Sequence, residues 1–498
     1  MNSNEVKEIN GIYEVDTDLT RSPYWNSDIA PTTVTSRKWK MWDIAALWVG
    51  MSVCIPTYML ASSLIAQGMA WWQAILTILI GNSIVLVPMI LNAHAGTKYG
   101  IPFPVFCRAS FGILGSNIPA ILRAIVACGW FGIQTWIGGW AIYQLIHAIY
   151  PQIALWPNIF PAGLGLTTGT GLCFMIFWAI NMWIVYKGME SIRHLEDWGA
   201  PFLLILGVLL LIWGYVKGGG FGPMFSQGSK FTSRREFWLF FFPALTGMIA
   251  YWATLSLNIP DFTRFAKSQK DQMYGQALGL PTTMTLFAFI GVAVTSATIV
   301  IFGEAIWDPV ILLSKFKNFW VVIISMAGLS IATLTTNLAA NVVSPANDFS
   351  NLWPKKISFR TGGFITGILG ILMMPWKLIA DPQGYIFKWL IGYSALLGPI
   401  GGVIICDYFV IRKTKLNLPD LYRTGEYTFK KGFNWKAIAA LVCGILPNIP
   451  GFFSQVGVSG IAQFWQRLYT YAWFTGFSVS FLVYWVLTIY FCKKEALN

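Results

Sequence analysis

Long apolar segments separated by short polar ones recur along the chain from Trp42 to Cys492. Most of them approach or exceed the roughly 20 residues that a helix needs to cross the hydrocarbon core of a bilayer. The pattern predicts about twelve transmembrane helices, at residues 42–66, 71–94, 118–149, 168–187, 199–217, 236–258, 277–302, 319–342, 362–380, 385–409, 434–450 and 471–492. The predicted fold class is therefore an all-α polytopic membrane protein.

Two of these spans carry sequences that interrupt a helix. The first contains Pro56 within Met51-Ser-Val-Cys-Ile-Pro-Thr-Tyr58, and the sixth contains Tyr251-Trp-Ala-Thr254 and ends at Asn258-Ile-Pro-Asp261. The two interruptions lie five spans apart, so a five-helix repeat would place its second copy upside down in the membrane. Paired breaks of this kind indicate a binding site near the midplane. Ordinary proline kinks explain the same residues equally well.

The composition supports a membrane environment. Of the 498 residues, 56% are hydrophobic and only 11% are charged, whereas a soluble domain carries about 25% charged residues. A chain with so little charge cannot cover itself with a water-compatible surface. We therefore expect membrane lipid to contact most of its surface. The seven Cys residues form no CxxC pair, which argues against a zinc site or a disulfide framework.

The net charge of +13 does not indicate nucleic-acid binding. The distribution of the basic residues instead predicts how the chain is oriented in the membrane. The basic residues are spread thinly between apolar segments and form no stripe. With the N-terminus on the cytoplasmic side, 25 of the 34 Lys and Arg residues fall in cytoplasmic segments. This asymmetry follows the positive-inside rule. We expect a multi-pass protein of the cell membrane with both termini in the cytoplasm.

The third span contains residues that suit a flat ligand. Trp130 and Gln134 are four residues apart and share a helix face, with Gly129 and Gly132 beside them. An indole stacks on a planar ring, and a carboxamide one turn away both donates and accepts a hydrogen bond. Trp252, at the suspected break of the sixth span, could cover the other ring face. Ordinary packing of tryptophan against small residues of a neighbouring helix is the more common explanation of such spacing.

The eighth span carries a group of oxygen atoms. Ala332, Thr335 and Thr336 share a face, and carbonyls freed near Gly50 and Val53 would complete a five-oxygen sodium site. Alternatively, both threonine hydroxyls bond back to their own helix. On an ideal helix Asn341 points roughly away from Ala332.

Motifs for other chemistry are missing from the sequence. There is no P-loop, GxSxG, HExxH or paired-carboxylate motif, and His94, His147 and His194 are scattered. No acid lies in the middle of a span, and Asp261, Glu304 and Asp407 stand at span ends, where solvation or ion pairing is expected. We expect a transporter and not an enzyme. An amino-acid or vitamin carrier, a channel and a substrate-sensing receptor remain as alternatives.

Several collinear motifs resemble the nucleobase–cation symporter-1 family, which includes bacterial hydantoin and allantoin permeases. The resemblance extends from about Trp25 to about Asn434. The motifs that carry it are Trp48-Val-Gly-Met51, Ile55-Pro-Thr-Tyr58, Gly129 to Trp136, Thr336-Asn-Leu-Ala-Ala-Asn-Val-Val-Ser-Pro345, Met373-Met-Pro-Trp376, Ala395-Leu-Leu-Gly-Pro399 and Asp407-Tyr-Phe409.

The resemblance implies the five-plus-five inverted-repeat fold of the leucine-transporter type with two additional C-terminal helices. The implied organisation is a cytoplasmic segment at 1–41, the first repeat at 42–217, the second at 218–409, a basic loop at 410–433, two further helices within 434–492 and a tail at 493–498. Trp130 and Trp252 match the family's stacking tryptophans, and Gln134 and Asn341 its substrate amides. The sodium ligands match the main chain of Gly50, Val53 and Ala332 and the hydroxyls of Thr335 and Thr336.

Two residues depart from the family pattern. Cys54 replaces a polar amide of hydantoin and allantoin carriers, and a thiol is a poor hydrogen-bonding group. Tyr251 replaces the glycine that usually precedes the second tryptophan. From the resemblance as a whole we expect a monomeric symporter. We expect no cofactor, apart from Na+ or H+ as the coupling ion. Its expected substrate is a small planar nitrogen heterocycle that also contacts Cys54 and Tyr251.

Overall fold

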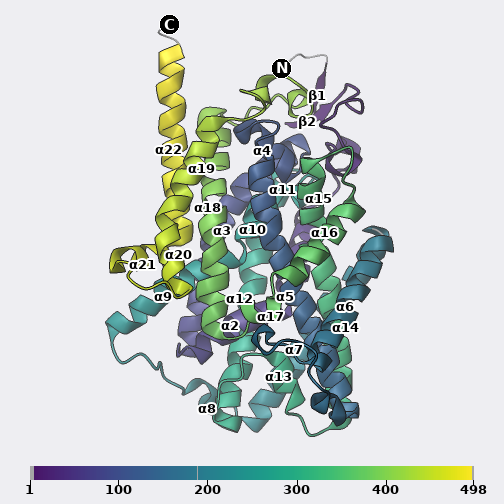
Figure 1. Ribbon diagram of the computed structural model, residues 1–498, viewed down its shortest axis with the longest axis vertical. Helices are drawn as coiled ribbons and strands as arrows, with labels where there is room; N and C mark the ends of the chain where they lie inside the picture. Colours follow the sequence, from purple (N-terminus) through teal and green to yellow (C-terminus); the bar gives the residue numbers. More distant parts are fainter. Residues whose placement is uncertain (1–4, 10, 188, 496–498) are drawn as a thin grey trace.

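The computed structural model describes residues 5–9, 11–187 and 189–495, and it describes side chains outside 189–199 and 491–495. Residues 1–4 of the predicted cytoplasmic segment and 496–498 of the predicted tail therefore lie outside the described part. The described chain is mostly helical (Figure 1), and its strands β1 (Val6–Ile9) and β2 (Ile12–Val15) form a small antiparallel hairpin. Sequence reasoning did not anticipate this hairpin.

The helices of the first half follow the predicted order. They are α1 (Met41–Ser52), α2 (Ile55–Ala66), α3 (Trp71–Tyr99), α4 (Phe103–Phe111), α5 (Asn117–Ile149), α6 (Thr168–Lys187), α7 (Met189–Lys217) and α8 (Phe221–Phe225). The second half begins with α9 (Arg234–Tyr251), α10 (Ala253–Asn258), α11 (Pro260–Thr263), α12 (Gln269–Phe302), α13 (Pro309–Ser314), α14 (Phe319–Asn341), α15 (Val343–Leu352), α16 (Phe359–Leu372) and α17 (Pro375–Leu378).

The tenth predicted span combines two π-helical segments with a regular helix. It consists of η5 (Gly384–Leu390), α18 (Ile391–Ile405) and η6 (Cys406–Ile411). The last two predicted spans contain α19 (Trp435–Ile445), α20 (Ile449–Gln455), α21 (Gln463–Tyr469) and α22 (Ala472–Glu495). Polar caps mark several starts: Ser268 accepts a hydrogen bond from the main chain at the start of α12, and Asn318 does so at the start of α14.

Among the described residues, nine helices are long and apolar enough to cross a membrane, or ten if the bent pair α1–α2 counts as one span. The predicted sixth span is divided between α9 and α10, and the predicted ninth is the shorter α16 followed by α17. The predicted eleventh span extends further than expected, from Trp435 to Gln455. Every predicted span thus corresponds to helical structure, and the breaks concentrate in the first and sixth spans.

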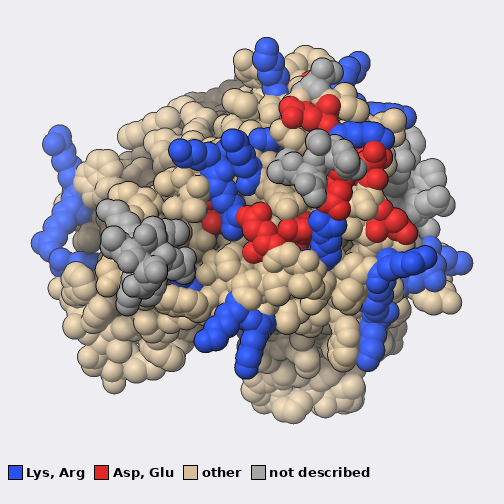
Figure 2. Space-filling view, turned by 90° about the horizontal axis from the view of Figure 1, so that it is seen from above, with Lys and Arg blue, Asp and Glu red and all other residues tan. Residues whose placement is uncertain are grey.

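Both ends of the chain lie at the same end of the molecule (Figure 1). The segment before α1 crosses this end: Asn26 donates to the carbonyl of Pro354, and Tyr422 donates to the carbonyl of Ile29. Figure 2 shows the same end from above, with many Lys and Arg side chains projecting near its edge and acidic side chains gathered in one part of it.

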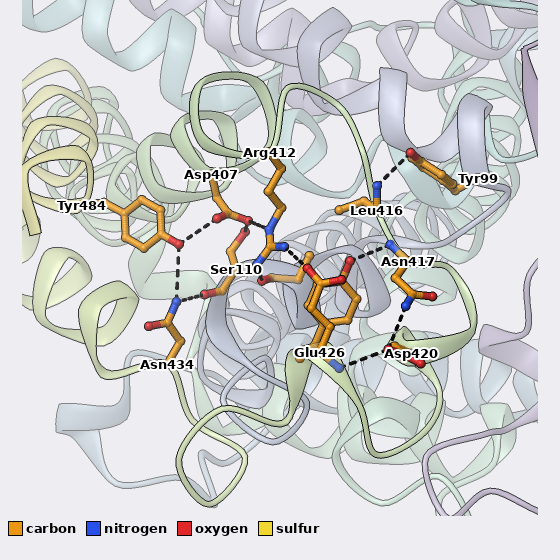
Figure 3. Close-up of polar contacts among 12 residues, drawn as sticks. Tyr99, Ser110, Asp407, Arg412, Leu416, Asn417, Asp420, Glu426, Asn434 and Tyr484 are labelled. Carbon is orange, nitrogen blue, oxygen red and sulfur yellow. Dashed lines mark hydrogen bonds and ion pairs between the residues drawn. The ribbon is translucent and has the colours of Figure 1, made fainter. Parts of the chain in front are cut away.

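A polar network anchors the two C-terminal helices to this end (Figure 3). The buried carboxylate of Asp407, in η6, accepts hydrogen bonds from Tyr484 of α22 at 2.7 Å and Ser110 of α4 at 2.9 Å. It also pairs with Arg412 at 2.8 Å. Asn434, which caps α19, donates to the carbonyl of Ser110. The sequence-based expectation of an ion-paired Asp407 is confirmed. The hydrogen bonds of Tyr484 and Asn434 join α22 to the end of the tenth span and the start of α19 to α4.

Candidate functional site

The first span breaks between α1 and α2, which are bent by 62° relative to each other. The amide of Cys54 donates to the carbonyl of Ser52 at 3.0 Å and not to that of Gly50, four residues earlier, as it would in a continuous helix. Pro56 lies in the first turn of α2, where a missing N–H costs no helical hydrogen bond. The proline therefore starts a second helix, and the break frees the carbonyl of Gly50.

The sixth span breaks at Trp252, whose backbone (φ −102°, ψ 7°) separates α9 from α10. Neighbouring helices take up the carbonyls that the interruptions release. The hydroxyl of Tyr393, from α18, donates to the carbonyl of Ala250 at 2.7 Å. Pro260 lacks the N–H that would bond to the carbonyl of Ser256, and Asn92 of α3 donates to that carbonyl at 2.6 Å. Partners of this kind are what a broken helix needs inside a bilayer.

Trp130 of α5 is buried at the point where the two broken spans meet the tenth. Its ring has edge-on contacts with Tyr251 at a centroid distance of 5.2 Å and with Trp389 at 5.9 Å. Tyr385 and Tyr393 approach it at 6.3 and 6.4 Å. Trp130 is therefore part of an aromatic centre contributed by α5, α9 and the tenth span.

Trp252 belongs to the same centre. It is buried, and its ring meets Tyr251 edge-on at 4.9 Å and Trp48 of α1 edge-on at 5.1 Å. The two predicted stacking tryptophans thus share one neighbour, Tyr251, and neither faces lipid. The structure brings together Trp130, Tyr251, Trp252 and the break of the first span.

The hydroxyl of Tyr251 reaches the break of the first span. It lies 2.9 Å from the hydroxyl of Thr57 and 3.3 Å from the thiol of Cys54, and all three residues are buried. Cys54 and Thr57 are themselves 3.3 Å apart. A polar triad therefore joins the start of α2 to the end of α9.

The glycines beside Trp130 serve helix packing. A Cβ atom at Gly129 would lie 2.2 Å from the ring of Trp389, and one at Gly132 would lie 2.4 Å from the carbonyl oxygen of Gly370 in α16. Both distances are far below a normal contact. The space that these glycines leave is already filled by protein.

Polar side chains line the other face of α5. Asn337 of α14 donates to Thr135 at 3.1 Å and to Asn181 of α6 at 3.2 Å, and Asn341 donates to Asn337 at 3.0 Å. On the face of α5 that carries Trp130, the side-chain carbonyl oxygen of Gln134 is buried and has no hydrogen-bond partner among the described residues. Buried polar atoms almost always have a partner, so this atom is available to a ligand or a water molecule.

The candidate ion ligands of α14 are close together, but they bond to one another. The hydroxyls of Thr335 and Thr336 donate to the carbonyl of Ala332 at 2.8 and 2.7 Å. On α1, Val53 is fully buried, whereas Gly50 is exposed and has open space where a side chain would begin. The three oxygens of α14 thus form a unit, and the break at the end of α1 leaves the carbonyl of Gly50 without its helical partner.

Polar contacts close the bundle between this centre and the end that carries both termini. Asp261 accepts hydrogen bonds from the amide of Phe103 at 2.8 Å and the hydroxyl of Ser344 in α15 at 2.5 Å. Arg123 of α5 forms a buried ion pair with Asp348 of α15 at 2.9 Å. Asp261 is therefore neither solvated nor ion-paired, contrary to expectation, because the folded chain surrounds it with donors.

Sequence reasoning missed several residues of the centre. Thr57, Trp48, Tyr385, Trp389 and Tyr393 all contact predicted site residues. The tenth span gave no polar signal beyond its aromatic residues, although π-helical segments often occur at functional sites. These residues are distant in sequence from Trp130, so only the fold relates them to it.

Comparisons with known proteins identify the family. A family described as permeases for cytosine/purines, uracil, thiamine and allantoin matches residues 31–476. The chain is 49% identical to a purine-uracil permease from Arabidopsis thaliana, over 95% of this chain and 79% of the relative. It is 44% identical to an allantoin permease from Bacillus subtilis, over 93% of this chain and 92% of the relative.

Solved structures agree in fold. Mhp1, a nucleobase-cation-symport-1 family transporter in a closed conformation with bromovinylhydantoin bound, superimposes with a TM-score of 0.75 at 26% identity, over 95% of this chain and 96% of Mhp1. An inward-facing conformation of Mhp1 gives 0.77 at 27% identity, over 95% of each chain. MhsT in complex with L-phenylalanine shares the fold alone, at 0.54 and 16% identity, over 89% of this chain and 97% of MhsT.

These matches confirm the predicted fold class, an all-α polytopic protein of the leucine-transporter type. They favour transport over the channel, receptor and enzyme alternatives, because the matched family consists of permeases. The chain is a multi-pass membrane transporter and belongs to the nucleobase–cation symporter-1 family.

Proposed function

We propose that the protein is a secondary active symporter that imports a small planar nitrogen heterocycle of the nucleobase, hydantoin or allantoin class by alternating access. Its relatives include a purine-uracil permease and an allantoin permease, and Mhp1 has been solved with bromovinylhydantoin bound. The observation that carries the proposal is the convergence of two buried indoles, Trp130 and Trp252, on Tyr251, with the unpartnered side-chain oxygen of Gln134 one helical turn from Trp130 on α5.

In this proposal the ring stacks on Trp130 and Trp252, and the amides of Gln134 and Asn341 bond to its polar edge. The indole nitrogen of Trp252 is buried without a partner among the described residues, which supports a polar ligand at the same place. Cys54 contributes a weak contact, since its thiol already lies against Thr57 and Tyr251. The centre contains no fixed charge, which favours a neutral heterocycle over an amino acid.

We further propose Na+ as the coupling ion, with H+ as the alternative. The ligands would be the carbonyls of Gly50, Val53 and Ala332 and the hydroxyls of Thr335 and Thr336. The freed carbonyl of Gly50 and the close grouping of the three α14 oxygens support this assignment. An ion that joins α1 to α14 favours substrate binding only if it binds the closed state more tightly than the open one.

The orientation that we propose has both termini in the cytoplasm of a cell-membrane protein. Both termini lie at one end of the molecule (Figure 1), and most Lys and Arg residues belong to the segments predicted for that side. A monomer is sufficient for this scheme, because one chain supplies every proposed ligand-contacting residue.

Uptake by proteoliposomes tests the proposal. Purified protein is reconstituted and offered radiolabelled uracil, cytosine, adenine, hydantoin and allantoin, with an inward Na+ gradient, an inward proton gradient or neither. We expect at least one heterocycle to accumulate above its external concentration with the Na+ gradient and to equilibrate without it. Accumulation with the proton gradient alone would identify H+, and not Na+, as the coupling ion. Failure to accumulate any of these compounds under any gradient would contradict the proposed function.

A further inference from the structure

Tyr251 occupies the place between the two tryptophans of the centre. It is the last residue of α9 and directly precedes the break at Trp252. Its ring meets Trp130 at an interplanar angle of 80° and Trp252 at 89°. The ring of Tyr251 therefore stands nearly perpendicular to both indoles and lies against each of them.

Contacts at both ends hold this side chain in place. Its ring lies against two indoles, and its hydroxyl lies within hydrogen-bonding distance of Thr57 and Cys54 in the first turn of α2. If Tyr251 rotated away, the hydroxyl of Thr57 would lose its oxygen partner and keep contacts only with sulfur atoms, that of Cys54 at 3.3 Å and that of Met284 at 3.8 Å. Because Tyr251 is almost completely buried, it would also need new space among its neighbours. The ring is therefore a fixed wall.

The other walls around Trp130 are closed by the backbone or by large rings. Trp389 fills the space beside Gly129, and the main chain of α16 fills the space beside Gly132. Tyr385 and Tyr393 are bonded to carbonyls of the two broken spans, at Pro56 and Ala250. Among the described residues of this centre, Tyr251 is the side chain that contacts both predicted stacking tryptophans, so shortening it would open space between them.

We propose that Tyr251 sets the size limit of the substrate site, so that single-ring heterocycles fit and fused two-ring purines are disfavoured. This inference rests on the proposed function and narrows its substrate class. The packing of the buried ring against the two indoles keeps it in position even without the hydroxyl, and the ring sets the limit. A second ring fused to a stacked ligand would compete with Tyr251 for the same space.

Uracil and xanthine are matched probes, because xanthine contains the uracil ring fused to a second, five-membered ring. Each is tested as a competitor of the uptake of a single-ring heterocycle that the wild-type protein accumulates. The competition is measured in proteoliposomes that contain the wild type, Tyr251→Leu or Tyr251→Ala. We expect the inhibition constant of xanthine, relative to the KM of the tracer, to fall in that order, by about tenfold or more for Tyr251→Ala. The constant for uracil should change less than that for xanthine.

Tyr251→Phe is the matched control, since it keeps the ring and removes only the hydroxyl. It should shift the relative constant for xanthine by no more than about threefold. If Tyr251→Ala fails to fold, Tyr251→Leu tests the proposal by itself. For Tyr251→Leu we expect the relative inhibition constant of xanthine to fall about threefold. An unchanged constant for xanthine in the shortened variants would overturn the size limit while leaving the proposed function intact. Lack of heterocycle uptake by the wild type would refute the proposed function instead.

Discussion

The aromatic centre and the oxygen group of α14 differ in how they are assembled. Trp130, Tyr251 and Trp252 come from α5 and from the break of the sixth span, and the tenth span packs around them. Ala332, Thr335 and Thr336 come from one helix and satisfy one another. The side chains of the aromatic centre are buried, whereas Gly50, the proposed contribution of α1 to the ion site, borders open space.

This difference indicates which contacts depend on the conformation of the protein. Rings that pack edge-on across several helices hold those helices together, so removing one ring affects the whole centre. Hydroxyls that bond within their own helix keep those bonds in any arrangement of the surrounding helices. We therefore expect substrate recognition to be sensitive to single changes, and the ion site to depend on how closely α1 approaches α14.

The largest effect is expected for Trp130→Ala. Removing the indole removes the proposed stacking face, and stacking of a base on an aromatic ring contributes about 1–3 kcal/mol. Heterocycle uptake should fall to background, while the protein still inserts into the membrane. Uptake is measured together with the amount of monodisperse protein, because loss of a core tryptophan also costs about 3–5 kcal/mol of stability. Trp183→Ala, which alters an exposed tryptophan of α6, is the control and should transport normally. Normal uptake by Trp130→Ala would remove the aromatic centre from the proposed function.

An intermediate effect is expected for the double variant Thr335→Ala with Thr336→Ala. Two of five proposed ligands are lost, so the Na+ concentration for half-maximal uptake should rise about tenfold, equivalent to about 1.4 kcal/mol. Uptake is measured at a series of Na+ concentrations. Thr366→Ala is the control, since Thr366 in α16 also bonds back to its own helix. If the double variant and the control show the same Na+ dependence as the wild type, these hydroxyls do not bind the coupling ion.

The smallest effect is expected for Gly50→Ala. The added methyl group meets no neighbouring atom, and alanine favours a helix over glycine by about 0.5–1 kcal/mol. Thermal unfolding in detergent should be unchanged or slightly higher, and Na+-dependent uptake should stay within about twofold. Gly279→Ala is the contrasting variant, because its Cβ would lie 2.8 Å from that of Trp48 and would disturb the packing of α1 on α12. A severe loss of uptake in Gly50→Ala would mean that the open side of α1 closes on another helix during transport.

Individual residues show why the sequence predicted only part of the site. Trp130 and Gln134 were recognisable because they share a helix face, and a spacing of four is visible in any helical segment. Pro56 was recognisable as an interruption, but its position in the first turn of α2 shows that it begins a helix. The gap beside Gly129 was ambiguous in the sequence, and the structure fills it with Trp389, 260 positions away.

The sequence by itself determined the membrane environment, the order of the helices and the location of both breaks. These features follow from local hydrophobicity and from residues that cannot continue a helix. Only the tertiary structure decided that Tyr251 stands between Trp130 and Trp252, and that Thr57 and Cys54 hold its hydroxyl. Contacts between distant segments depend on how whole helices pack, and no local pattern encodes that arrangement.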